Sequence, residues 1–475
     1  MKKTKIICTL GPATDEESIL MTMIQSGMDI ARLNFSHGTK EEHARRIAMV
    51  RHVGDKLDVP VGILLDTKGP EIRTGKMHDD LVYLKEGSEI ILTTQEIEGT
   101  SEKISITYEQ LPREVKPGDS ILLDDGILHL EVKEVSGNDI VCIVIAGGEL
   151  RSNKGINVPG VKVKLPAITK KDREDIYFGL EQGIDFIAAS FVRNKEALEQ
   201  IRGLCREKGQ HPFLIAKIEN EEAIENIDEI IDAADGIMIA RGDLGVEIPA
   251  EEVPYLQKMI IEKCNFKMKP VITATQMLDS MIRNPRPTRA EAADVANAIY
   301  DGTDAVMLSG ESAAGKYPVE AVNMMTKIAE ETEHHLNEHN LKRQRDIKSR
   351  ITISSTIAHM SVQAAEELHA GCIIAATMSG TTARYLSGFR PSCMIAGVTP
   401  HQWVMRRMQL FWGVFPVQNR ETTTTDELIS SAMEKTRRKN FLTKGDICVM
   451  TAGIAARENT PYTTNMIRAF RVEES

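Results

Sequence analysis

Residues 213–243, FLIAKIENEEAIENIDEIIDAADGIMIARGD, contain two short apolar runs with a helical pattern between them. The runs, residues 213–220 and 236–243, each end in charged or polar residues, which is typical of a buried strand that leads into a loop. Between them apolar residues recur at i, i+3 and i+4, and this spacing predicts a helix over residues 220–234. A strand–helix–strand unit predicts two parallel strands in one sheet, and therefore an α/β fold.

The same unit recurs along the chain, for example around a second predicted helix at residues 288–302. Eight strand–helix units predict a closed (β/α)8 barrel, with an open doubly wound sheet as the alternative. The predicted strands are residues 5–12, 28–38, 61–70, 185–192, 213–220, 236–243, 270–277 and 304–311.

Two segments differ from this pattern, one after the third predicted strand and one at the C-terminal end, from about residue 346. After the third predicted strand, about 100 residues alternate apolar and polar side chains between turn signals, which predicts an inserted antiparallel β domain. Because it leaves and rejoins the barrel through Gly- and Pro-rich segments, we expect it to act as a lid over the barrel mouth. We predict a barrel domain (residues 1–69 and 170–345), a β lid domain (70–169) and a C-terminal α/β domain (346–475).

Composition and charge exclude several classes of protein. The chain has 475 residues, 42% of them hydrophobic, and a net charge of −11 without a long basic stretch, so nucleic acid is not an expected partner. No run of roughly 18 apolar residues is present, and the short apolar N-terminus lacks a cleavage site, so we expect a cytoplasmic protein without a membrane span. The seven cysteines are typical of reduced core residues.

Residues that follow the carboxyl ends of barrel strands form the active site in this architecture. Glu219 and Asp243 end adjacent predicted strands, and two carboxylates there suit magnesium. Arg32, Arg73 and Lys217 would supply positive charge for an anionic substrate. Lys217 and Glu219 also share one face of their strand, so a structural ion pair is the alternative.

One motif is a decoy. Residues 310–317, GESAAGKY, nearly match a phosphate-binding loop that follows a strand. Tyr317, however, stands where Ser or Thr must bind magnesium, and Pro318 suits an ordinary helix start. We therefore predict no phosphate-binding loop of this type.

Several longer motifs resemble pyruvate kinases over essentially the whole chain. They are RLNFSHG (32–38), LLDTKGPEIRTG (64–75), KIEN (217–220), DGIMIARGDLGVEIP (235–249) and the run from Ile272 to Ala313. The resemblance implies that the chain transfers the phosphoryl group of phosphoenolpyruvate to ADP, giving pyruvate and ATP in the final step of glycolysis.

The resemblance also implies a role for individual residues. It implies Mg2+ (or Mn2+) at Glu219 and Asp243, and K+ at Asn34, Ser36, Asp66 and Thr67. It implies substrate contacts at Arg32, Lys217, Thr275, Ala240, Arg241, Gly242 and Asp243, and nucleotide contacts at Arg73, Asn34 and Lys171, with Lys170 as an alternative to Lys171. It implies that Lys217, Thr275, Arg32, Arg73, Ser309 and Glu311 are catalytic. The resemblance further implies potassium dependence, because a glutamate at the position of Glu71 accompanies it in this family.

In the predicted C-terminal domain, a strand ends in hydroxyl-rich residues that open a helix, which forms either an anion site or an ordinary cap. The resemblance implies a phosphorylated effector at Thr377, Ser379, Gly380, Thr381 and Thr382. Fructose 1,6-bisphosphate, a sugar monophosphate and AMP remain open, because Thr382 and the loop GIAARENTPYTTN (453–465) differ from the commonest pattern. A bacterial-type homotetramer is also implied, without the N-terminal extension or the additional domain of some members.

Two other functions are compatible with the scaffold. A catalytically inactive sugar-phosphate sensor would have lost catalytic groups, whereas Lys217, Glu219, Asp243 and Thr275 are all present. A magnesium-dependent barrel enzyme acting on enolates, such as a pyruvate-using aldolase, would not need the lid with Arg73 or the potassium residues.

Overall fold

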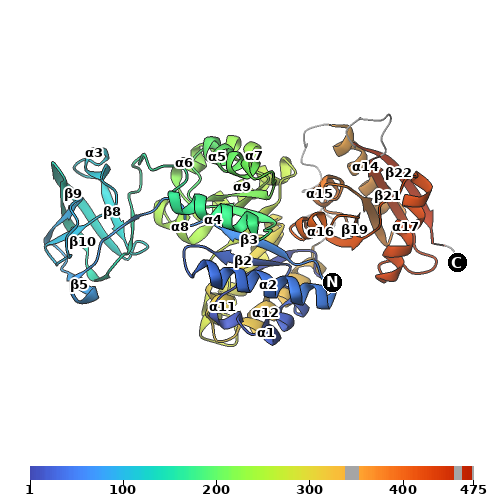
Figure 1. Cartoon of the computed structure of the whole chain (residues 1–475), viewed down its shortest axis with the longest axis horizontal. Helices are drawn as coiled ribbons and strands as arrows, with labels where there is room; N and C mark the ends of the chain where they lie inside the picture. The colour runs from blue at the N-terminus through green and yellow to red at the C-terminus, as the bar shows by residue number, and fades with distance from the viewer. Residues whose placement is uncertain (337–351, 454–462, 473–475) are drawn as a thin grey trace.

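The computed structural model describes residues 1–336, 352–453 and 463–472. A central barrel lies between a β-rich body at one end of the molecule and an α/β body at the other (Figure 1). None of the helices in these ranges is both long enough and apolar enough to cross a lipid bilayer.

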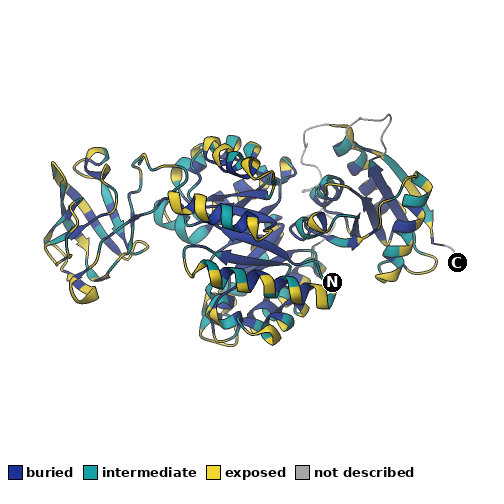
Figure 2. Ribbon diagram, viewed as in Figure 1, coloured by how far each residue is buried: buried dark blue, intermediate teal, exposed yellow. Residues whose placement is uncertain are grey.

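Eight parallel strands close into a barrel, which confirms the predicted (β/α)8 fold and excludes the open sheet. Each strand lies within its predicted segment. The strands are β1 (Lys5–Thr9), β2 (Ile30–Asn34), β3 (Gly62–Asp66), β13 (Phe186–Ala189), β14 (Phe213–Ile218), β15 (Gly236–Ala240), β16 (Val271–Ala274) and β17 (Ala305–Leu308). All are buried except at their ends, and the surrounding helices turn their exposed faces outward (Figure 2).

The barrel helices follow the predicted pattern with one difference. The predicted helix 220–234 is divided at Asn226, whose side-chain amide donates to the carbonyl oxygen of Arg193 at 2.9 Å. The predicted helix 288–302 is α10, which starts after a capping box formed by Thr288 and Glu291. The helices are α1 (Glu17–Gln25), α2 (Lys40–Leu57), α4 (Lys170–Glu181), α5 (Lys195–Glu207), α6 (Glu221–Glu225), α7 (Ile227–Ala233), α8 (Arg241–Glu247), α9 (Val253–Phe266), α10 (Arg289–Asp301), α11 (Gly310–Ala313) and α12 (Pro318–His334).

The β-rich body interrupts the barrel between β3 and α4 and has a hydrophobic core of its own. Its main sheet has the strand order β4-β12-β8-β9-β10-β6-β7, and β5 pairs with β11. The elements are β4 (Ile72–Arg73), β5 (Leu81–Leu84), β6 (Glu89–Thr93), β7 (Lys103–Ser105), α3 (Leu111–Glu114), β8 (Ser120–Leu123), β9 (Leu128–Ser136), β10 (Asp139–Ala146), β11 (Gly148–Arg151) and β12 (Gly155–Asn157). Except for the parallel pair β6–β7, neighbouring strands are antiparallel.

The third body is a five-stranded sheet of order β20-β19-β18-β21-β22, flanked by helices. The sequence patterns predicted three of these strands and missed the edge strands β20 and β22. The elements are α14 (Ile353–Glu367), β18 (Cys372–Ala376), α15 (Thr381–Gly388), β19 (Met394–Thr399), α16 (Gln402–Met408), β20 (Val414–Gln418), α17 (Thr425–Arg438), β21 (Ile447–Gly453) and β22 (Thr464–Arg471). The predicted junction at residues 345–346 lies outside the described residues.

The same type of hydrogen bond recurs four times at the end of the barrel opposite the mouth, which we call the floor. An aspartate precedes β2, β13, β15 and β17, and its carboxylate accepts the backbone N–H of a residue near the start of the preceding strand at 2.8–2.9 Å. The four pairs are Asp29 with Ile6, Asp185 with Ile63, Asp235 with Leu214 and Asp304 with Val271. Two of these aspartates also anchor the C-terminal body, because Arg406 donates to Asp185 and Arg390 to Asp304, each at 2.7 Å.

Candidate active site

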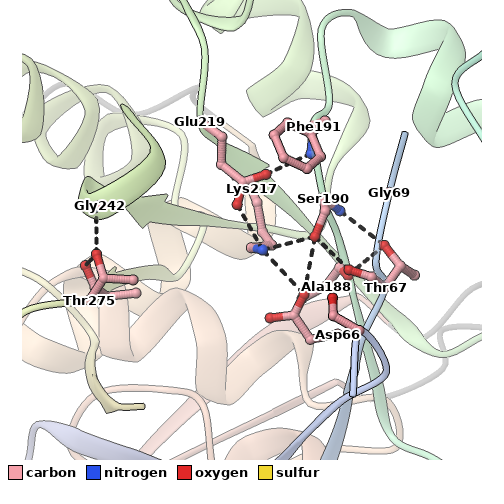
Figure 3. A network of polar contacts seen from close by, with 12 residues as sticks. Asp66, Thr67, Gly69, Ala188, Ser190, Phe191, Lys217, Glu219, Gly242 and Thr275 are labelled. Atoms are coloured by element: carbon pink, nitrogen blue, oxygen red, sulfur yellow. Dashed lines mark hydrogen bonds and ion pairs between the residues drawn. The ribbon is translucent and has the colours of Figure 1, made fainter. Parts of the chain in front are cut away.

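The ammonium group of Lys217 lies at the barrel mouth among three acceptors (Figure 3). Its Nζ atom is 2.7 Å from Oε1 of Glu219 and 3.2 Å from Oδ1 of Asp66, and it donates to Oγ of Ser190 at 2.8 Å. All four residues are buried. Lys217 is therefore held by two carboxylates and a hydroxyl that come from three different strand ends.

This arrangement keeps Lys217 charged. Burial lowers its pKa, but the charges of Asp66 and then Glu219 outweigh burial and raise the pKa above its ordinary value. For Asp66, burial raises the pKa, whereas the charges of Lys217 and Arg32 lower it. The charges outweigh burial, so the pKa of Asp66 lies below its ordinary value. Arg32 donates from Nε to Asp66 at 2.7 Å.

Glu219 and Asp243 form a carboxylate pair that is only partly compensated. Burial raises the pKa of both, and the charge of Asp243 raises the pKa of Glu219 further. A divalent cation would supply the missing positive charge, and carboxylate oxygens are ligands that Mg2+ accepts. Within the described ranges, no three His, Cys, Asp or Glu residues gather as a metal site. A magnesium ion here would thus take its remaining oxygens from substrate and water.

The residues expected to bind potassium come from two adjacent strand ends. Asn34 of β2 lies opposite Asp66 of β3 in the parallel ladder, and the Asn34 side chain accepts the N–H of Ser36 at 3.0 Å. Thr67 accepts from Ser190 at both its side-chain oxygen (3.0 Å) and its carbonyl oxygen (2.7 Å). The fold therefore brings these oxygen-bearing residues to the ends of two paired strands, where Asp66 also contacts Lys217.

A cleft of about 420 Å³ opens between the mouth and the β-rich body. Asp243 and Phe191 line it from the barrel, and Arg73 lines it from β4. The Arg73 side chain binds Glu71 at 2.6 Å and donates to the carbonyl oxygen of Asn153 at 2.7 Å. The β-rich body thus contributes a cation to the same cleft as Asp243.

Comparisons with known proteins identify the family of this chain. A model described as pyruvate kinase, barrel domain matches residues 1–322, and one described as pyruvate kinase, alpha/beta domain matches residues 355–470. A pyruvate kinase from Geobacillus stearothermophilus is 52% identical over 476 residues, covering 100% of this chain and 81% of its own. A pyruvate kinase from Clostridium acetobutylicum is 48% identical over 475 residues, covering 100% of both chains.

The chain belongs to the pyruvate kinase family.

The three-dimensional structure agrees with this assignment. A crystal structure of a pyruvate kinase from Cryptosporidium parvum superposes with a TM-score of 0.94 at 39% identity, covering 99% of this chain and 96% of that one. The chain is a phosphotransferase that converts phosphoenolpyruvate and ADP to pyruvate and ATP, as predicted. Pyruvate kinases as a family require a divalent metal ion and K+. Nothing favours the inactive-sensor alternative.

In this pyruvate kinase, Thr275 lies directly after β16 in a strained backbone conformation. Its φ is +68°, which a β-branched residue adopts rarely. Its hydroxyl accepts the N–H of Gly242 at 2.7 Å, which ties it to the start of α8. The Arg241 side chain donates to the Thr275 carbonyl oxygen (2.8 Å) and pairs with Asp294 (2.7 Å), so it braces this corner.

Other predicted residues have partners within the protein. The Glu311 carboxylate accepts the backbone N–H of Ser309 at 2.7 Å and of Leu278 at 3.1 Å, which joins the ends of β16 and β17. Lys171 donates to Asp175 at 2.5 Å and to the carbonyl oxygen of Phe35 at 2.8 Å, and Phe35 lies between Asn34 and Ser36 in the sequence.

The sequence-based selection missed Ser190 and Phe191, because it took no residue from the fourth barrel strand. The signal was available, since a serine at the carboxyl end of predicted strand 185–192 follows the rule that selected the other residues. Both residues contact the Lys217–Glu219 pair.

The hydroxyl-rich loop of the C-terminal body opens α15. Thr377 accepts the N–H of Gly380 at 2.9 Å, and the hydroxyls of Ser379 and Thr381 lie 2.9 Å apart. Thr382 is buried, with its hydroxyl 2.8 Å from that of Thr464. Most of the loop 453–465 lies outside the described residues.

Proposed function

We propose that Lys217 is the central catalytic residue of phosphoryl transfer, supported by Arg32 and Arg73. The observation that carries this proposal is the buried ammonium at the mouth, charged and held by Asp66, Glu219 and Ser190. As the bond between the phosphorus and the enol oxygen breaks, an oxygen of ADP bonds to the phosphorus. Negative charge on the transferring group is neutralised by fixed cations, with little other chemistry required of the protein.

We propose that Glu219 and Asp243 hold the divalent cation, Mg2+ or Mn2+. When bound, this ion neutralises substrate charge and orients the reacting oxygens. The backbone of residues 240–243 would hold the substrate carboxylate, because α8 begins there and its first N–H groups lack partners within the helix, although that of Gly242 donates to the Thr275 hydroxyl. K+ would bind among the oxygens of Asn34, Ser36, Asp66 and Thr67.

The enolate left after transfer needs a proton on its methylene carbon, and we propose Thr275 as the group beside that carbon. Gly242 N–H holds the Thr275 hydroxyl from one side. Ser309 and Glu311 would line the same side of the site, where Glu311 bridges two loops through their backbone amides. Arg73, Asn34 and Lys171 would contact the nucleotide, while the β-rich body covers the mouth and excludes water.

For the C-terminal body we propose an effector site at Thr377, Ser379, Gly380, Thr381 and Thr382. Backbone N–H groups and hydroxyls at the start of α15 suit a phosphate group. Fructose 1,6-bisphosphate, a sugar monophosphate and AMP are the candidate effectors. We further propose a cytoplasmic homotetramer, as in the bacterial members that the sequence resembles.

One coupled assay tests the ion and effector proposals together. ATP formation from phosphoenolpyruvate and ADP is measured with Mg2+ or Mn2+, with K+ or without it, and with each candidate effector. We expect activity to require both ions and one effector to lower the phosphoenolpyruvate concentration for half-maximal rate. A flat response to all effectors would contradict the effector proposal alone, and activity without a divalent ion would contradict the carboxylate assignment.

A further inference from the structure

The end of β13 makes a corner, Ser190–Phe191, between β3 and β14, and we call these two residues the 190–191 corner. Ser190 is 5% exposed, and its Oγ accepts from Lys217 at 2.8 Å while donating to the carbonyl oxygen of Thr67 at 2.7 Å. Its backbone N–H donates to the Thr67 hydroxyl at 3.0 Å. The same Oγ also lies 3.2 Å from Oδ1 of Asp66, which can accept its single proton in place of the Thr67 carbonyl oxygen. With either acceptor, a lone pair of the serine oxygen is left for Lys217 (Figure 3).

The second residue of the corner contacts the other member of the Lys217–Glu219 pair. The backbone N–H of Phe191 donates to Oε2 of Glu219 at 2.6 Å. Phe191 has a φ of +53°, a conformation that a bulky residue adopts only where its surroundings enforce it. One two-residue segment thus binds Lys217 through a side chain and Glu219 through a backbone amide.

The neighbouring strand end leaves space for this corner only because it carries a glycine. A Cβ atom at Gly69 would lie 2.8 Å from Cδ2 of Phe191 and 2.9 Å from Cβ of Ser190, both shorter than side-chain contacts allow. Gly69 itself has a φ of +73°, which favours glycine. The 190–191 corner thus packs against Gly69 on one side and contacts Lys217 and Glu219 on the other.

The chemistry of Lys217 explains why a neutral acceptor is useful there. An ammonium group has three donors, and Asp66 and Glu219 engage it with full negative charge. Without the serine hydroxyl, only these two carboxylates would hold the ammonium. The Ser190 hydroxyl gives the ammonium a third fixed contact that adds no charge. All three donors are then engaged, so a phosphoryl group that reaches Lys217 replaces one of these contacts or shares its donor.

We propose that Ser190 is a positioning residue for phosphoryl transfer, with its hydroxyl holding the Lys217 ammonium while the Phe191 amide holds the Glu219 carboxylate. This inference rests on the proposed role of Lys217. A residue that acts through Lys217 in the transition state should affect kcat and leave ground-state binding of substrate and metal unchanged.

Ser190→Ala and Ser190→Thr test the hydroxyl directly in the full-length enzyme. We expect Ser190→Ala to lower kcat by about ten- to a hundredfold, as for loss of a hydrogen bond to a charged group. The KM for phosphoenolpyruvate and the Mg2+ concentration for half-maximal rate should change less than about threefold. Ser190→Thr should restore kcat to within about threefold of wild type, because it keeps a hydroxyl on the same Cβ.

Ser387→Ala is the matched control. Ser387 is buried, and its hydroxyl donates to the carbonyl oxygen of Trp412 at 2.7 Å in the C-terminal body, remote from the mouth. The Ser387→Ala variant should keep the wild-type kcat. An equal loss in Ser387→Ala, an equal loss in Ser190→Thr, or a rise in KM at unchanged kcat would each overturn the positioning role.

A double-mutant cycle separates this inference from the role of Lys217. In the Lys217→Ala background, Ser190→Ala should lower the residual kcat by less than about twofold, because its target is already absent. A full additional loss would overturn the inference. Wild-type kcat in Lys217→Ala would refute the role of Lys217, whereas wild-type kcat in Ser190→Ala alone would refute only the positioning role.

Discussion

The Nζ atom of Lys217 lies 2.7 Å from the Glu219 carboxylate, two residues further along the chain. Sequence periodicity placed both side chains on one face, and they do form an ion pair. The pair is not isolated, because Asp66 and Ser190 contact the same ammonium and Phe191 contacts the same carboxylate. A structural ion pair and a catalytic lysine are therefore compatible descriptions of one site.

Removal of the Lys217 charge tests its proposed role. We expect Lys217→Met to lower kcat by at least about tenfold, or about 1.4 kcal/mol, because a cation facing the transferring group is lost. Phosphoenolpyruvate and Mg2+ binding should largely survive. Lys5→Met, which removes another buried lysine at the floor, is the control and should keep its kcat. Comparable kcat values for wild type and Lys217→Met would refute the assignment.

Potassium dependence follows from the oxygen-bearing residues beside Lys217. Thr67 and Asp66 lie at the end of β3, and Glu71 follows them in the same segment as Arg73. We expect the rate with K+ to exceed the rate with Na+, or without a monovalent cation, by at least about tenfold. The measurement is initial velocity at constant ionic strength, with tetramethylammonium as the balancing cation. Full activity in Na+ would contradict the prediction.

Lys5 makes stability depend on pH through the interface between barrel and C-terminal body. It is fully buried, donates to the Val414 carbonyl oxygen at 2.6 Å and lies 4.8 Å from the Phe415 ring centroid. Burial lowers its pKa from 10.5 to about 8, although Asp29 acts in the opposite direction. The unfolded chain therefore holds a proton that the folded chain releases between these values, and its contribution to stability rises with pH there.

The free energy of unfolding of wild type minus that of Lys5→Met should be constant below the folded pKa of about 8. Above this pKa, the difference should increase, in favour of wild type, by up to about 1.4 kcal/mol per pH unit. The increase should end at the pKa of Lys5 in the unfolded chain. Denaturant unfolding at about pH 7 and about pH 10 measures this difference. A difference that does not change with pH would contradict the assigned protonation.

Arg390 and Asp304 form a buried ion pair that joins the two larger bodies, with 2% and 6% of their side chains exposed. Arg390→Leu leaves the Asp304 carboxylate without this counter-charge, and we expect destabilisation by about 3–5 kcal/mol. Both tryptophans of the chain, Trp403 and Trp412, belong to the C-terminal body, so their fluorescence follows its unfolding.

An exposed pair supplies the control for this prediction. Lys56 lies 3.2 Å from Glu17, with 55% and 45% of their side chains exposed. Lys56→Ala should change stability by less than about 1 kcal/mol, because exposed ion pairs are weak. Equal effects of the two substitutions would show that burial of Arg390 and Asp304 does not matter.

Much of the fold could be predicted from local sequence patterns. Strand segments, barrel closure and the clustering of Glu219 with Asp243 all follow from apolar periodicity and from the rule that parallel strands end at one edge. The division of the helix at Asn226 and the strands β20 and β22 could not be predicted in this way. Each depends on hydrogen bonds to residues far along the chain, such as Asn226 with Arg193.

The site was predictable in its charged residues and not in its contacts. The sequence by itself determined that Lys217, Glu219 and Asp243 lie at strand ends around one mouth, because side-chain direction and strand polarity are local properties. Only the tertiary structure decided that Lys217 also contacts Asp66 and Ser190. Ser190 is 27 positions away, and its hydroxyl meets the ammonium because parallel pairing sets β13 beside β14, with Phe191 in a left-handed conformation directly after the serine.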